Sequence, residues 1–282
     1  FDSQGVYLYN NANVSLTGSG NVIITGTAAN GTDIAYGVTI SYTSRVKSNS
    51  GSLTINGTSC NTGSQSKGVS IYNFAYVSST GSGNVTITGI AATGTNYACG
   101  VFIIDSTRVT TVSGNLSING TSCGTGSFSS GVYLYDSANV SSTGSGNVTI
   151  TGTTPGNVTG GIGINSISSG DRIASNGGLI TLNANSVNLT GTVNATTAGN
   201  VVIQTLGAGV DLGGADSSSN LGLTSAEINN ITAGTLIIGN GTTGAIVNSN
   251  AIRRTNTTLG VNLTLISGNT ITQSGAGNLF VA

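Results

Sequence analysis

The chain repeats itself about every 31 residues, and this period constrains its fold more than any other feature. The spacings between successive copies are 32, 31, 32 and 31 residues, followed by a weaker step of 30 residues. Alternate copies are the more similar ones, so the larger unit is a pair of about 63 residues. A period of this length is typical of solenoids, in which each repeat buries its apolar side chains only by stacking on its neighbours. The copies start at Gly5, Gly37, Gly68, Gly100 and Gly131, with a weaker start at Gly161.

Within each copy the apolar residues alternate with polar ones, which is the period of a β-strand and not that of a helix. Each copy holds a Val-x-Leu or Val-x-Ile segment, then a single aliphatic residue, then a second alternating segment after a glycine turn. This pattern predicts three short strands per coil with β-branched residues turned inward. For the copy at Gly131 the predicted core residues are Val132, Leu134, Val140, Val148 and Ile150.

Stacked coils satisfy this pattern because each strand can pair in parallel with its equivalent in the next coil. Parallel neighbours lie about 4.8 Å apart, so equivalent side chains form columns. We therefore predict an all-β fold, a right-handed parallel β-helix (β-solenoid), with the hand taken from the usual hand of parallel crossovers. At the first corner of the coil we expect a polar ladder of Asn10, Asn73, Asp105 and Asp136.

The regular repeats cover residues 1–160, and residues 161–282 continue in the same style with less regular spacing. Residues 225–233 are the one stretch that reads as a helical turn. No linker or charge run separates the two parts, so we expect one continuous solenoid. Its length would be roughly nine to eleven coils, or about 45–50 Å at the spacing of paired strands.

The composition excludes several classes of partner. Only 5% of the residues are charged, the net charge is −1, and seven lysines and arginines are spread over 282 residues. Such a chain does not track a nucleic-acid backbone. It also lacks the run of about 18 apolar residues that a membrane-spanning helix needs.

The C-terminal third, residues 178–282, resembles the haemagglutination-type repeats of bacterial filamentous haemagglutinins and related giant surface proteins. The residues that carry this resemblance are 209–214 (GVDLGG), 223–239 (LTSAEINNITAGTLIIG) and 263–268 (LTLISG). The resemblance implies a secreted right-handed β-helix at a bacterial cell surface. It supplies no catalytic residues.

The sequence offers little for catalysis, so we expect no enzyme, no catalytic residue and no cofactor. There is no histidine, and the eight carboxyl residues are mostly far apart. The nearest candidate is Asp105 with Asp136, at equivalent positions of successive coils near Arg108, where two carboxylates could hold Ca²⁺ or form an acid pair. The alternative is an exposed corner whose charge Arg108 offsets. A polysaccharide-degrading or carbohydrate-binding β-helix remains the second functional hypothesis.

Two outward columns are candidates for surface contacts. An aromatic stripe on a solvent face suggests contact with a sugar or a protein, although stacking between strands explains it equally. Paired threonines resemble an ice-binding face, and ice binding is the third functional hypothesis. Asparagine interrupts the array of threonines, however, and the ordinary composition of exposed strands also explains it. The aromatic candidates are Tyr7, Tyr9, Tyr72, Phe102, Tyr133 and Tyr135, and the threonines are Thr86, Thr88, Thr149 and Thr151.

Asn-x-Ser/Thr sequons recur throughout the chain, so glycosylation is expected at some of them. Three cysteines without histidine do not predict a zinc site, and we expect small core or turn residues. Cys60 and Cys123 lie at equivalent positions two coils apart, about 9.6 Å by the strand spacing, which is too far for a disulfide. Examples of the sequons are Asn56, Asn119, Asn157, Asn194 and Asn240.

The ends carry apolar residues and no polar cap, which a terminal coil of a soluble solenoid normally has. We therefore expect head-to-tail contacts with a second copy, or continuation within a longer chain. Together these patterns predict a non-enzymatic extracellular structural protein, a rod within a bacterial surface fibre, filament or adhesin, with glycans or a host surface as further partners. The end-to-end candidates are Val6, Leu8, Leu279, Phe280 and Val281.

Overall fold

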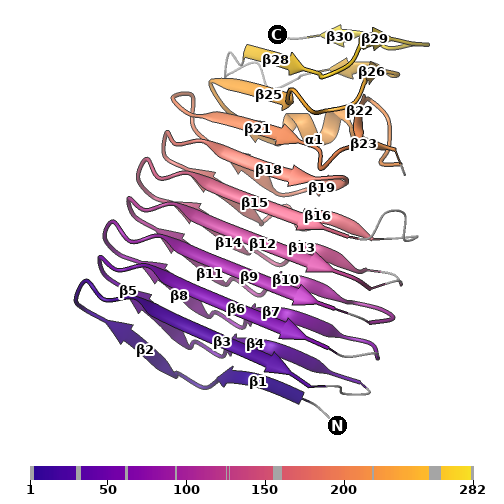
Figure 1. Ribbon diagram of the computed structural model, residues 1–282. Helices are drawn as coiled ribbons and strands as arrows, with labels where there is room; N and C mark the ends of the chain where they lie inside the picture. The colour runs from indigo at the N-terminus through magenta and orange to yellow at the C-terminus, as the bar shows by residue number, and fades with distance from the viewer. Residues whose placement is uncertain are drawn as a thin grey trace.

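The chain folds into a parallel β-solenoid of about eight turns, which rises from the N-terminal coil to the C-terminal one as a single stack (Figure 1). The computed structural model describes residues 3–29, 33–60, 63–92, 94–124, 126, 128–154, 161–217, 219–253 and 262–280. The predicted all-β class and coils of about 31 residues are confirmed.

Three parallel sheets form the sides of the stack, because every strand of a coil pairs with its equivalent one coil later. Sheet A contains β1 (Ser3–Leu8), β4 (Ala35–Ser41), β7 (Ser66–Tyr72), β10 (Cys99–Ile103), β13 (Ser130–Leu134), β16 (Ile162–Ser166) and β19 (Val187–Leu189). Sheet B contains β2 (Asn13–Leu16), β5 (Arg45–Ser48), β8 (Tyr76–Ser79), β11 (Arg108–Thr111), β14 (Asn139–Ser142), β17 (Arg172–Ser175), β20 (Thr192–Asn194) and β24 (Ile231–Thr232). Sheet C contains β3 (Val22–Ala28), β6 (Leu53–Ser59), β9 (Val85–Ala91), β12 (Leu116–Ser122), β15 (Val148–Thr153), β18 (Ile180–Ala184), β21 (Asn200–Gln204), β25 (Thr235–Gly239) and β28 (Asn262–Ile266).

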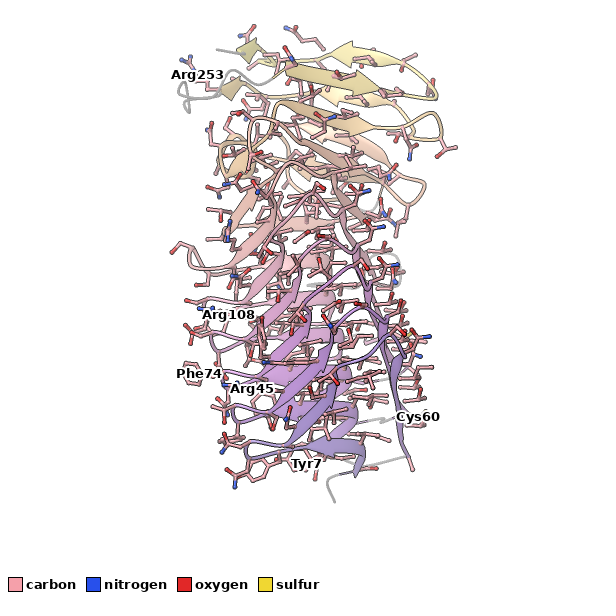
Figure 2. All side chains as sticks on the ribbon, turned by 90° about the vertical axis from the view of Figure 1, so that its left-hand side faces the viewer. Tyr7, Arg45, Cys60, Phe74, Arg108 and Arg253 are labelled. Atoms are coloured by element: carbon pink, nitrogen blue, oxygen red, sulfur yellow. The ribbon has the colours of Figure 1, made fainter. Side chains whose placement is uncertain are left out.

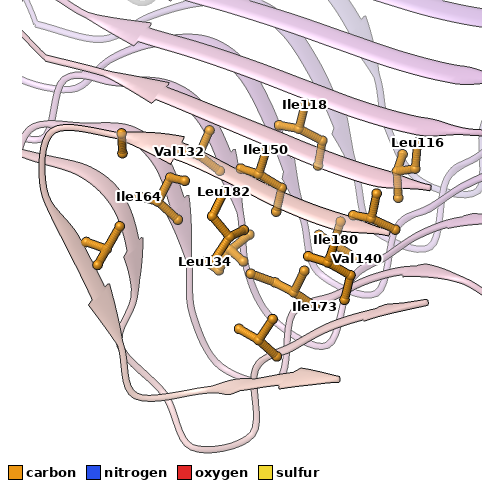
Figure 3. Packing of buried hydrophobic residues seen from close by; sticks show 14 of the residues in the cluster. Leu116, Ile118, Val132, Leu134, Val140, Ile150, Ile164, Ile173, Ile180 and Leu182 are labelled. Carbon is orange, nitrogen blue, oxygen red and sulfur yellow. The ribbon is translucent and has the colours of Figure 1, made fainter. Parts of the chain in front are cut away.

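The core is a set of aliphatic columns that run along the inside of the rod. Val69 pairs with Val38 in the preceding coil and with Val101 in the following one. The predicted core residues of the Gly131 copy have no exposed surface. Figure 3 shows four of their side chains packed between the sheets, those of Val132, Leu134, Val140 and Ile150. Since the inward side chains of each coil contact those of the next, core and backbone ladder form together.

Left-handed backbone conformations mark the corner between sheets A and B. The φ angles are 53° and 61° at Asn73 and Phe74, and 58° and 55° at Asp105 and Ser106. Asn10 and Asp136, the other members of the predicted polar ladder, also have positive φ. Asn and Asp tolerate this region better than other non-glycine residues, which accounts for their recurrence at the first corner position.

The expected nine to eleven coils are wrong, because the chain leaves the three-strand path after β21. It forms β22 (Gly209–Leu212) and β23 (Asn220–Leu223), then α1 (Ser225–Asn229), the predicted helical turn, before it returns to sheets B and C. Thr224 and Glu227 form a capping box at α1. Sheet D has the order β23-β22-β26-β29, with β26 (Ile246–Asn248) and β29 (Ile271–Gln273), and sheet E pairs β27 (Ile252–Arg253) with β30 (Leu279–Phe280).

Two glycine columns explain the recurring Gly-Val step. Where sheet C of one coil leads into sheet A of the next, the two backbones approach so closely that no side chain fits between them. A Cβ atom on Gly120 of β12 would lie 1.9 Å from the carbonyl oxygen of Gly131 in β13, and one on Gly57 would lie 2.0 Å from that of Gly68. Glycine is required here by the close approach of backbone to backbone.

We predict that Gly120→Ala destabilises the fold by about 3 kcal/mol, since the added methyl group must push the backbones of β12 and β13 apart. The matched control is Gly18→Ala, because a Cβ atom at Gly18 meets nothing within 4 Å. This control should change stability by less than about 0.5 kcal/mol. Urea unfolding of both variants measures the difference, and equal midpoints would refute the backbone contact as the reason for the column.

Candidate functional site

The outer face of sheet B carries four of the seven cationic residues of the chain. Arg45, Arg108 and Arg172 each open a strand of this sheet, and Lys47 lies on the same strand as Arg45. Strand pairing places the three arginines in one column, in the order Arg45, Tyr76, Arg108, Asn139, Arg172. Figure 2 shows Arg45 and Arg108 one above the other on the same side of the rod, with Phe74 beside them. We call this surface the basic face.

A shallow groove of about 560 Å³ lies at the N-terminal half of the basic face. The Lys47 ammonium lies 5.3 Å from the centre of the Tyr76 ring. The Phe74 side chain is 64% exposed, which is unusual for an aromatic ring and places an apolar surface at the groove. The groove is lined by Thr43, Arg45, Lys47, Phe74, Ala75, Tyr76, Ser106 and Arg108.

No strand of sheet B contains a carboxyl residue. Among the residues that the structure describes, none of the four cations of the basic face forms an ion pair. Asp171 precedes Arg172 but is buried, and it accepts hydrogen bonds from the Ala138 and Ser168 N–H groups. Asp105 and Asp136 lie at the adjoining corner. The arginines of the basic face are therefore exposed without a carboxylate partner on their own sheet, and Lys47 lies half-buried against the Tyr76 ring.

Asp105 and Asp136 occupy adjacent coils as the sequence predicts, with Ser106 N–H donating to the Asp136 carbonyl oxygen at 2.7 Å. Burial, and then the charge of Asp136, raise the pKa of Asp105. Within the described part of the chain no three His, Cys, Asp or Glu residues are grouped as a metal site would require. The expectation that the chain holds no metal stays a prediction, with this pair as its one weak candidate for a metal site.

The aromatic residues fall into two columns rather than one. Phe102 stacks on Tyr133 with ring centres 5.3 Å apart, in the column that starts at Tyr7. Tyr72 is in register with Ser41 in the neighbouring column, and its ring contacts Tyr42, which in turn contacts Tyr9. The rings of Tyr7, Tyr9 and Tyr135 are exposed, and those of Tyr72 and Phe102 are half-buried.

The expected exposure of Tyr133 is wrong, because its side chain is only 8% exposed. It lies between Phe102 and Asn165 in register, and Tyr135 contacts its ring. Burial raises the pKa of Tyr133 to about 12. Tyr133 therefore stabilises the sheet and offers no surface of its own, while a contact role for the exposed rings stays a prediction.

Sequence reasoning missed a buried lysine beneath the aromatic rings. The Lys67 ammonium lies 4.8 Å from the ring centres of both Tyr36 and Phe102, and burial lowers its pKa. Its strand partner Cys99 is a buried free thiol, and burial raises the pKa of that thiol to about 11. Since both groups are buried and packed within sheet A, we assign them to packing.

Cys60 and Cys123 are also free, and their backbone positions are separated by Ala92 in the same column. The predicted threonine array has the expected register, with Thr86 and Thr88 of β9 beside Ser117 and Asn119 of β12. All four predicted threonines are half-buried, and Thr151 accepts a hydrogen bond from the Asn183 amide at 3.2 Å.

The predicted sequons lie in different structural environments. Asn56 and Asn119 lie within strands of sheet C and are half-buried, as is Asn194 in β20. The Asn240 amide donates to Gln204 at 2.6 Å. Asn157 lies outside the described residues, and glycosylation stays a prediction.

The end-to-end candidates lie in the first and last coils. Val6 and Leu8 of β1 are half-buried, whereas their strand partners Val38 and Ile40 are fully buried. Leu279, which is 40% exposed, and Phe280 form β30. Val281 lies outside the described residues.

A second pocket, of about 410 Å³, lies where sheet A stops at β19. It brings together Asp216 and Glu227, which sequence reasoning treated as isolated. The Val187 N–H donates to Asp216 at 3.2 Å, the Leu189 N–H donates to Glu227 at 3.4 Å, and the Asn230 amide donates to the Leu189 carbonyl oxygen at 2.7 Å. Side chains thus replace the backbone partners that a further strand would supply.

The carboxylates of this pocket are occupied by structural hydrogen bonds. Asp216 also accepts from the Gly222 N–H, and Glu227 accepts from the N–H and hydroxyl of Thr224 in the capping box. The Asp216 residue as a whole is exposed, but its carboxyl group faces these N–H donors. Burial of the carboxyl group raises its pKa to about 7. The only sequence signal for the pair was an unusual concentration of Asp and Glu between residues 211 and 227.

No protein-family model matches the chain, and no curated protein or solved structure is significantly similar to it. The resemblance to haemagglutination-type repeats is therefore not confirmed. Of the residues described, none belong to a helix with the length and apolarity needed to cross a membrane.

We predict that the free energy of unfolding decreases as the pH rises from about 4 to about 7. An unfolded aspartate titrates near pH 3.9, so between these values the folded chain, with the Asp216 pKa at about 7, binds more protons than the unfolded one. The stability present below the lower pKa is therefore lost as the pH rises through the higher one. The raised pKa values of Asp105 and Asp171 act in the same direction.

Urea unfolding at several pH values tests this prediction. Asp216→Asn should reduce the slope of stability against pH below that of the parent chain. An Asp216→Asn slope equal to that of the parent chain would contradict the assignment to this carboxyl.

Proposed function

We propose that the chain is part of a non-enzymatic extracellular structural rod at a bacterial surface, within a fibre, filament or adhesin whose β-helix continues beyond both ends described here. The observation that carries this proposal is the unbroken stack itself. Sheet C pairs nine strands in parallel, and the aliphatic columns inside it have almost no exposed surface. A ladder of this kind gives stiffness along the rod, because bending it must strain many backbone hydrogen bonds together.

The surface of the rod supports a passive role. The chain is nearly uncharged, and the acidic pair in the pocket beside β19 is held by backbone and capping hydrogen bonds. A catalytic carboxylate must be free to exchange a proton with a substrate. The resemblance of residues 178–282 to surface-protein repeats supports the extracellular location.

The first coil supports the joining of rods. Val6 and Leu8 belong to the same columns as Val38 and Ile40, but they lack the neighbouring coil that covers every later member. The unpaired edges of β1, β2 and β3 need a partner as well. A coil of the same kind satisfies both needs, whether it comes from the same polypeptide or from a second copy.

We predict that the double variant Val6→Lys/Leu8→Lys abolishes end-to-end association of the chain. Inward-pointing charges on an edge coil would be buried by a docked neighbour, and such burial is strongly unfavourable. Electron microscopy and sedimentation velocity would show short single rods in place of filaments.

The matched control is Tyr7→Lys, on the same strand but with its side chain exposed. This variant should assemble like the parent chain, and circular dichroism should show that both variants keep their β-structure. Dispersed single rods from the parent chain at high concentration would overturn self-association, and filaments from the double variant would overturn the assignment to β1.

A further inference from the structure

We propose that the basic face binds a linear acidic polysaccharide lying along the rod axis, with its carboxylates or sulfates on Arg45, Arg108 and Arg172. The arginines recur in every second coil. With paired strands about 4.8 Å apart, successive arginines are about 9.6 Å apart along the axis. The face therefore presents a row of separated positive charges and not a dense patch.

This spacing selects among polyanions. Each strand of a DNA duplex carries a charge about every 3.4 Å, so a nucleic acid would leave most of its phosphates unpaired on this face. A sugar unit of an extended polysaccharide is about as long as the rise of one coil. A polymer with an acid group on every second sugar matches a column with an arginine in every second coil.

The residues between the arginines suit a sugar as well. Tyr76 occupies the coil between Arg45 and Arg108, and the exposed Phe74 ring beside it can pack on the apolar C–H face of a sugar ring. Thr43 and Ser106 line the same groove and offer hydroxyl groups to sugar hydroxyls. Asn139 lies between Arg108 and Arg172 in register.

The charge arrangement leaves the arginines available. None of them is ion-paired within the described ranges, and sheet B itself has no carboxyl residue among its strands. Asp105 and Asp136 at the corner reduce the positive potential on one side of the groove. Such carboxyls favour a ligand of low charge density over a densely charged one.

Calorimetric titration of the full chain with hyaluronate oligosaccharides, which alternate acidic and neutral sugars, tests the proposal. We expect the hexasaccharide to bind more tightly than the tetrasaccharide, because it reaches a third arginine. Binding should weaken as salt is added. Arg45→Gln/Arg108→Gln should weaken hexasaccharide binding about tenfold, the loss of two exposed ion pairs.

The matched control is Arg253→Gln, an exposed arginine at the other end of the rod (Figure 2). It should bind the hexasaccharide like the parent chain. Unchanged binding by the double variant, or equal binding of neutral maltohexaose, would overturn the proposal. Tighter binding of oligothymidylate or of phosphatidylserine vesicles would overturn the choice of a polysaccharide.

Binding along the side of the rod does not depend on its end-to-end assembly. The Val6→Lys/Leu8→Lys variant should therefore bind the hexasaccharide as the parent chain does. If the parent chain bound the hexasaccharide but did not assemble, only the structural proposal would fail, and if the parent chain assembled without binding the hexasaccharide, only the polysaccharide site would fail.

Discussion

The structure depends on one constraint: each strand finds its backbone hydrogen-bond partners in the coils before and after its own. Equivalent residues must then stack with no shift, because a slip of one residue would turn every inward side chain outward. The glycine columns follow from the same constraint. If the backbones at Gly120 and Gly131 approach closely in one coil, they do so in all coils that share the register. The fold is therefore built from the same contacts repeated in successive coils, and not from contacts around one central cluster.

The break in sheet A shows how strict the constraint is. When the chain leaves its path after β21, β19 has no following strand, yet the N–H groups of Val187 and Leu189 and the carbonyl oxygen of Leu189 have hydrogen-bond partners. Asp216, Glu227 and Asn230 supply an acceptor, an acceptor and a donor where a strand would supply backbone groups. A buried backbone group without a partner is costly, which explains why acidic side chains lie at this site. The raised pKa of Asp216 is a consequence of that burial.

The repeat made the core, the strand register and the corner residues predictable, because these depend on local pattern and on identical neighbours. Val132 and Ile150 are buried for that reason. The departures arise from contacts that no repeat encodes. Tyr133 is covered because its ring stacks on Phe102, and Lys67 is buried because two aromatic rings enclose it. Asp216 reaches β19 only because the chain leaves the three-strand path after β21. The number of coils is lower than expected for the same reason. The column of Arg45 and Arg108 was readable, since each directly precedes the single aliphatic residue of its copy.

Because charged residues are scarce in this chain, the position of each cation is informative. In a chain with 5% charged residues, a random scatter would not set Arg45, Arg108 and Arg172 in one column with one coil skipped each time. The skipped coils match the alternation of 32- and 31-residue spacings, so the pair of coils, and not the single coil, is the unit that repeats both shape and charge. A stiff rod with such a unit holds its charges at fixed intervals, whereas a flexible chain would average them. Fixed intervals favour a ligand that is itself periodic, and they favour it more strongly as more units are engaged, because each added contact needs no further ordering of the protein.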